Sequence, residues 1–114
     1  MAAHRYDNDR YTRNGRPLRC RLSFRNGPFA NMTFTLHQDV TTIGRGIGND
    51  ILLRDESVSR QHARLTFIKG QWFIEDMRSA NGVAINGVPL RGSLALQPRD
   101  VVRIGDVEMV YDLA

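Results

Sequence analysis

Three residue types that could do chemistry stand close together in the stretch SVSRQHARL, residues 57–65. Ser59, Arg60 and His62 lie within four positions of one another. A serine near a histidine suggests a nucleophile with its general base, and a histidine alone suggests a metal ligand. A serine beside an arginine suggests instead a site that holds an anion. The rest of the sequence decides among these three chemistries.

Catalysis and metal binding find little support elsewhere in the chain. A Ser–His pair needs a third group that orients the base, and the sequence contains no G-x-S-x-G elbow. The possible metal ligands His4, His37, His62 and Cys20 are scattered and show no ligand spacing. We therefore expect a protein that is not an enzyme and that uses neither a metal nor a cofactor.

An anion site suits the residues better. Arg45 offers a planar fork of five donors that matches phosphate oxygens, Arg60 adds a second cation, and Ser59 adds a hydroxyl. Asn81 offers an amide that can both donate to and accept from a peptide backbone. These groups can converge only if their loops share one end of the fold. The three predicted loops are residues 44–50, 54–62 and 77–82.

The segments around these loops alternate apolar and polar residues, which is typical of half-buried β-strands. In LRCRLSFR, for example, Cys20 and Leu22 fall on one face, so we expect Cys20 to point into the core. Asn86-Gly87 between two apolar runs predicts a two-residue type I′ hairpin. Turn residues recur about every ten positions and no helical stripe is found, which favours an all-β sandwich or barrel. The predicted strands lie within residues 18–25, 32–36, 40–44, 63–69, 72–77, 83–90 and 100–113.

The length of 114 residues predicts one domain, and its net charge of +4 is unevenly distributed. Residues 1–26 hold seven arginines against two aspartates, whereas the remainder holds nine basic and ten acidic residues. We expect residues 1–17 to be a disordered basic arm and residues 18–114 to be the folded domain. Because the body is near neutral, we expect no nucleic-acid partner, although the arm keeps that alternative open.

Localisation is predicted from what the sequence lacks. There is a single cysteine, a polar N-terminus without the pattern of a signal peptide, and no apolar run long enough to span a bilayer. These features predict a cytoplasmic protein with no membrane span.

Four motifs in order give the chain a resemblance to a known family. Gly44-Arg45, then NDILLRDESVSRQHARL, then EDMRSANGVAING resemble a forkhead-associated (FHA) domain over about residues 20–113. The resemblance implies an all-β fold, an SMAD/FHA-type eleven-stranded β-sandwich of two twisted antiparallel sheets. It also implies a module that binds phosphothreonine peptides through the loops at one end.

The resemblance assigns a role to each residue of the expected phosphopeptide site. It implies that Arg45 grips the phosphate, that Ser59 adds a hydroxyl or backbone contact, and that Arg60 contacts phosphate or peptide backbone. It implies that Asn81 holds the peptide main chain beside the phosphothreonine. Ala80 departs from the family pattern, because several members have threonine or serine there, and its methyl group removes one hydroxyl from the site.

Three further residues are implied to support the site rather than to touch the ligand. Gly44 and Gly82 would allow tight backbone packing, and His62 would brace the loop that presents Ser59. Selectivity in the family depends mainly on the third residue after the phosphothreonine. The charged residues placed to read it are a mixed set that indicates no single preference: Arg54, Asp55, Glu56 and Arg78.

The implied partner is a phosphothreonine-containing protein or peptide, such as a Ser/Thr protein kinase or its substrate. An alternative is a phosphorylation-independent scaffold or oligomerisation domain that uses a strand face. Thr12, a threonine among the arginines of the arm, is a possible phosphoacceptor whose phosphorylated form could dock on the site of its own or another chain.

Overall fold

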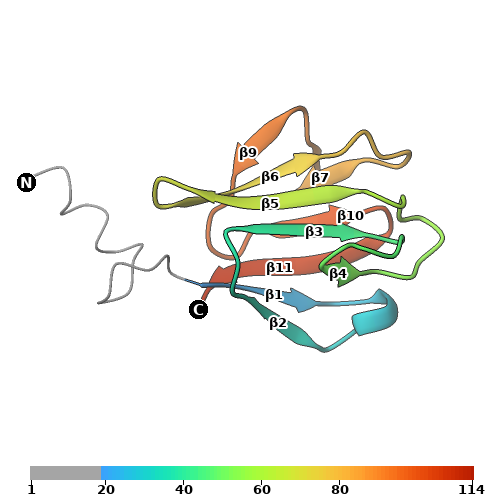
Figure 1. The fold of residues 1–114 in the computed structure, drawn as a ribbon, viewed down its shortest axis with the longest axis horizontal. Coiled ribbons are helices and arrows are strands. Elements are labelled where there is room, and N and C mark those ends of the chain that lie inside the picture. The colour runs from blue at the N-terminus through green and yellow to red at the C-terminus, as the bar shows by residue number, and fades with distance from the viewer. Residues whose placement is uncertain (1–18) are drawn as a thin grey trace, which may run out of the picture.

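The computed structural model describes residues 19–114 and shows a β-sandwich (Figure 1). The disorder expected of residues 1–17, and the phosphoacceptor Thr12, lie outside the described residues. In the described part the chain forms eleven strands and one 3₁₀ turn, Gly27–Phe29. The strands are β1 (Cys20–Phe24), β2 (Thr33–Leu36), β3 (Val40–Gly44), β4 (Ile51–Leu52), β5 (Ala63–Ile68), β6 (Gln71–Asp76), β7 (Val83–Ile85), β8 (Val88–Pro89), β9 (Ser93–Ala95), β10 (Val101–Ile104) and β11 (Val107–Leu113). The predicted all-β class is confirmed.

The strands form two sheets, with the order β2-β1-β11-β10-β7-β8 in one and β4-β3-β5-β6-β9 in the other. All pairings are antiparallel except that β4 runs parallel to β3, with Ile43 beside Ile51. The resemblance implied two antiparallel sheets, which the other pairings confirm, and β3–β4 is the one parallel pair among residues 19–114. Its cause is local: Asp50 Oδ2 accepts from the Thr42 backbone N–H at 2.9 Å and folds residues 45–50 back along β3.

The core lies between the sheets and is filled by alternate strand residues, as the sequence pattern predicted. Cys20 is completely buried among them, and desolvation raises the pKa of its thiol to about 12. Such a thiol stays protonated and behaves as a small apolar side chain. The largest fully buried side chains include Trp72, Tyr111, Leu22, Ile43, Leu65 and Met109.

Loops at one end of the sandwich face away from the C-terminus (Figure 1). This end gathers the β3–β4, β4–β5 and β6–β7 loops, and the β10–β11 turn is bonded to the second of them. The Asn86-Gly87 hairpin lies at the other end of β7, and φ values of 52° and 83° confirm the predicted type I′ turn. No helix among residues 19–114 is long and apolar enough to cross a membrane.

Candidate functional site

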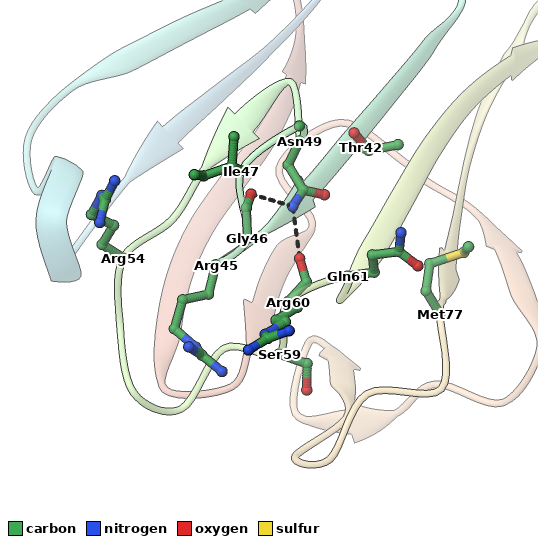
Figure 2. A pocket seen from close by; sticks show the side chains of 11 residues that line it. Thr42, Arg45, Gly46, Ile47, Asn49, Arg54, Ser59, Arg60, Gln61 and Met77 are labelled. Atoms are coloured by element: carbon green, nitrogen blue, oxygen red, sulfur yellow. Dashed lines mark hydrogen bonds between the residues drawn. The ribbon is translucent and has the colours of Figure 1, made fainter.

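The β3–β4 loop is fastened to the β4–β5 loop by backbone and side-chain hydrogen bonds. The Arg45 N–H donates to the Ser59 carbonyl at 2.9 Å, and the Gly46 N–H donates to the Arg60 carbonyl at 3.1 Å. Asn49 Nδ2 then bridges the two loops, donating to the carbonyls of Arg60 at 2.7 Å and Gly46 at 2.8 Å (Figure 2). Arg45 and Arg60 are thereby held side by side.

Gly44 is required for this close approach. A Cβ at Gly44 would overlap the Arg60 carbonyl oxygen and would lie 2.7 Å from Asn49 Nδ2. This carbonyl oxygen cannot easily move away, because it also accepts hydrogen bonds from Asn49 Nδ2 and the Gly46 N–H. The glycine expected to support the site therefore lies where the two loops touch.

The β6–β7 loop is fastened to the same β4–β5 loop from the other side. The Ala80 N–H donates to Ser59 Oγ at 2.9 Å, and Asn81 Nδ2 donates to the Ser57 carbonyl at 2.9 Å. The three loops singled out in the sequence therefore do share one end of the sandwich, with Ser59 in contact with both neighbours.

His62 is completely buried and links the β4–β5 loop to the β6–β7 loop. The Ser59 backbone N–H donates to His62 Nδ1 at 2.9 Å, and His62 Nε2 lies 2.7 Å from the Gly82 carbonyl. Because Nδ1 accepts, the proton is assigned to Nε2, which donates to Gly82. The ring is therefore neutral and links the loop that presents Ser59 to the turn before β7.

These internal bonds determine which polar groups remain for a ligand. The Ser59 backbone N–H is already used by His62, so its hydroxyl hydrogen is the donor that this residue still offers. Arg45 Nε donates to the Val58 carbonyl at 2.8 Å, which orients the guanidinium and leaves both Nη groups unbonded. Of the two contacts that the sequence left open for Ser59, only the hydroxyl is compatible with this arrangement.

An open pocket of about 930 Å³ lies against these groups. Figure 2 shows the side chains of Arg45 and Arg60 ending beside Ser59, with Arg54 set apart and with Gln61 and Met77 on the far side. Its lining residues are Thr42, Arg45, Gly46, Ile47, Gly48, Asn49, Arg54, Ser59, Arg60, Gln61 and Met77. The lining contains three arginines and no acidic side chain, so the pocket is a cation-rich site suited to an anion. Ala80 and Asn81 are not part of the lining.

Two contributors to the site were not assigned a role from the sequence. Asn49 belongs to the N-D-I segment, and its position directly after a glycine-rich loop was a usable signal for a loop-bridging amide. Ser57 has no such signal: its Oγ donates to Asp55 Oδ1 at 2.6 Å and accepts from the Asp106 N–H at 2.8 Å. That second bond ties the loop to the β10–β11 turn, which is 49 residues away in sequence.

Among residues 19–114, no group of three or more histidine, cysteine, aspartate or glutamate side chains is placed to hold a metal ion. The polar side chains of the pocket lining are those of arginine, serine, threonine, asparagine and glutamine, which suit hydrogen bonding to an oxyanion and a peptide.

Comparisons with known proteins point to one family. A family model described as "FHA domain" matches residues 41–105, more than half of the chain. The oxoglutarate dehydrogenase inhibitor of Corynebacterium efficiens is 39% identical over 90 residues, which cover 79% of this chain and 63% of that protein. The chain thus matches less than two thirds of the length of that relative.

Solved structures with a similar fold include two that were studied for phosphopeptide or phosphothreonine-dependent binding. Mycobacterium tuberculosis EmbR in complex with a low-affinity phosphopeptide has a TM-score of 0.82 and 27% identity, covering 99% of this chain and 29% of that chain. A structure from work on phosphothreonine-dependent FHA domain interactions has a TM-score of 0.75 and 27% identity, covering 84% of this chain and 97% of that chain.

Proposed function

We propose that this chain, which belongs to the FHA domain family, binds phosphothreonine in a peptide or protein through its cation-rich loop end. It would act as a non-enzymatic adaptor in signalling by Ser/Thr protein kinases, and its partner would be such a kinase or a substrate of one. The single observation that supports this best is the pocket itself, in which arginine Nη groups and a serine hydroxyl converge with no acidic side chain in the lining.

The chemistry matches a phosphate monoester. A phosphorylated threonine has a charge of about −1.5 to −2 near neutral pH and three strong acceptor oxygens. The two Nη groups of Arg45 can bind two of these oxygens, the Ser59 hydroxyl can donate to the third, and Arg60 adds charge. Each charge-assisted hydrogen bond contributes about 1.5–3 kcal/mol before the loss of peptide freedom is subtracted. The sum suits a reversible signalling contact.

Asn81 and Ala80 would complete the site on its other side. One amide hydrogen of Asn81 is used by the Ser57 carbonyl, which leaves the amide oxygen and the second hydrogen for the main chain of a bound peptide. Ala80 offers no side-chain donor, but its backbone N–H positions the Ser59 hydroxyl. Both residues would therefore act from outside the pocket lining.

The test is a titration of the purified 114-residue chain with a phosphothreonine peptide library, beside matched phosphoserine and unphosphorylated sets. We expect binding to the phosphothreonine set alone. Arg45→Ala and Ser59→Ala should each weaken it at least about tenfold, since each removes a charge-assisted hydrogen bond to phosphate. Arg99→Gln, which removes the same charge at an exposed loop between β9 and β10, is the matched control.

Thermal unfolding of each variant shows whether it still folds. Undiminished phosphopeptide binding by both folded site variants would contradict the assignment of the site. Equal binding of phosphorylated and unphosphorylated peptides would favour the phosphorylation-independent scaffold instead.

A further inference from the structure

The pocket holds one more cation than a single phosphate needs. Arg45 and Arg60 lie together beside Ser59, whereas Arg54 lines the same pocket from a separate position (Figure 2). Two guanidinium groups already match the charge of about −2 that a phosphothreonine brings. Arg54 then remains as a positive charge without a counterpart in the lining.

Arg54 also finds no carboxylate elsewhere in the described part of the protein. The ion pairs formed by residues 19–114 join Arg25 to Glu108 and Arg64 to Glu75, and Arg54 takes part in neither. Asp55 follows Arg54 directly, but its Oδ1 accepts from both the Ser57 N–H at 2.9 Å and the Ser57 hydroxyl. The nearest acid in sequence is therefore occupied within its own loop.

The backbone beneath Arg54 is firmly held, so its side chain projects from a fixed point. Leu53 is completely buried, and its N–H donates to the Gly44 carbonyl at 2.8 Å. Gly44 in turn packs against Arg60 in the core of the site. Arg54 is thus exposed and unpaired, but its backbone is held by the same Gly44 contacts that hold the loops of Arg45 and Arg60.

We propose that the pocket takes a ligand with a second anionic group near the phosphothreonine, and that Arg54 binds this group. The ligand class is a phosphothreonine peptide whose flank contains a glutamate, an aspartate or a second phosphorylated residue. The inference rests on the proposed function and adds to it the chemistry of the flank. Of the four charged residues that the sequence offered for reading that flank, Arg54 is the one that lines the pocket.

The experiment uses the full chain and synthetic phosphothreonine peptides with alanine flanks, into which one glutamate is introduced and moved position by position along both sides. A parallel set has phosphoserine in place of glutamate, which separates a carboxylate from a phosphate as the preferred group. We expect one position at which glutamate tightens binding about fivefold, the size of a favourable exposed ion pair, with a larger gain for phosphoserine.

Arg54→Gln should abolish that gain while the preference for phosphothreonine persists. Arg99→Gln, remote from the pocket lining, should retain the full gain and serves as the charge-matched control. The same measurement at rising salt should reduce the gain in the wild-type chain, because the pair is exposed.

Each other result overturns the inference in a recognisable way. If a glutamate changed the affinity for the phosphothreonine peptide at no position, Arg54 would not bind an acidic group of the ligand. A gain that survives Arg54→Gln but is lost in Arg78→Gln would assign the second anion to the neighbouring loop. Failure of the wild-type chain to bind any phosphopeptide would overturn the proposed function itself, and this inference with it.

Discussion

The loop end of the sandwich and the end that holds the C-terminus are closed by turns of different kinds (Figure 1). At the C-terminal end the chain reverses in two-residue turns, such as Asn86-Gly87, and Asp100 ties that turn to the β9–β10 loop by accepting from Asn86 Nδ2 at 2.9 Å and from the Gln97 N–H at 2.8 Å. At the loop end the β10–β11 turn is equally short, but the β3–β4, β4–β5 and β6–β7 loops are longer and are held by bonds between loops, such as those from Asn49 to Arg60 and from Ala80 to Ser59.

The difference lies in what each bond holds in place. The bonds at the C-terminal end hold turns that lie away from the pocket, so damage to them should lower stability and leave the pocket intact. A bond between loops sets the position of groups that a ligand would touch, so damage to it should lower stability and affinity together. The two ends therefore offer paired substitutions that separate folding from binding.

The largest effect is expected from a pair of glycines. Gly44→Ala places a methyl group against the Arg60 carbonyl and should destabilise the protein by about 3–4 kcal/mol, with loss of phosphopeptide binding. Gly87→Ala meets no atom within 4 Å and should cost only about 1 kcal/mol, from its φ of +83°, with affinity unchanged. Urea unfolding and peptide titration of both variants provide the measurement.

Equal losses of stability in the two variants would contradict the comparison, since the contact of a Cβ at Gly44 with the Arg60 carbonyl would then cost no more than the positive φ of Gly87. Binding retained by a folded Gly44→Ala variant would show that the contact with Arg60 does not position the site.

The next effect comes from the side chains that close each end. His62→Ala removes a buried ring that links Ser59 to Gly82, and should lower the free energy of unfolding by about 2–3 kcal/mol and affinity at least about tenfold. Asp100→Ala removes the acceptor for Gln97 and Asn86, and should lower stability by about 1–2 kcal/mol with unchanged affinity.

Stability and affinity should therefore both fall in His62→Ala, whereas only stability should fall in Asp100→Ala. A His62→Ala variant that unfolds more easily yet binds as tightly at a temperature where it is folded would show that Ser59 keeps its position without the brace.

The same contrast explains what the sequence could predict. The Asn86-Gly87 hairpin was predictable because a type I′ turn needs two adjacent residues with positive φ, and that requirement is visible in the chain. The alternation that placed Cys20 in the core is equally local. Arg45 and Ser59 were identified as candidates because their chemistry is apparent from residue type, and their motif resembled a family.

Other features depend on partners that are remote in sequence. The strands β4 and β9 contain two and three residues, too few to show a period, and they exist because β3 and β6 offer pairing edges. The bond from the Asp106 N–H to Ser57 spans 49 residues and has no local signature. The exclusion of acidic side chains from the pocket is also a property of packing, since Asp55 and Glu56 stand directly beside Arg54 in the chain.

The smallest expected effect concerns Asp55, which stabilises the β4–β5 loop at the site end. Hydrogen bonds from the Ser57 side chain and backbone lower the pKa of this carboxyl below its ordinary value. A carboxyl with a lowered folded-state pKa stabilises the fold above its unfolded pKa, and this contribution is lost as the pH falls through the folded value. The loop should therefore loosen only below about pH 4.

Asp55→Asn removes this titration and provides the measurement. The Tm of the wild-type chain should exceed that of the variant by no more than about 2 °C near pH 7, because Asp55 is only half-buried and solvent screens its charge. The difference should close as the pH falls below about 4. Unfolding is the appropriate readout, because a bound phosphate titrates on its own near pH 6 and would obscure a change in affinity. A difference in Tm that stays constant down to pH 3 would mean that the charge of Asp55 contributes nothing to the stability of the loop.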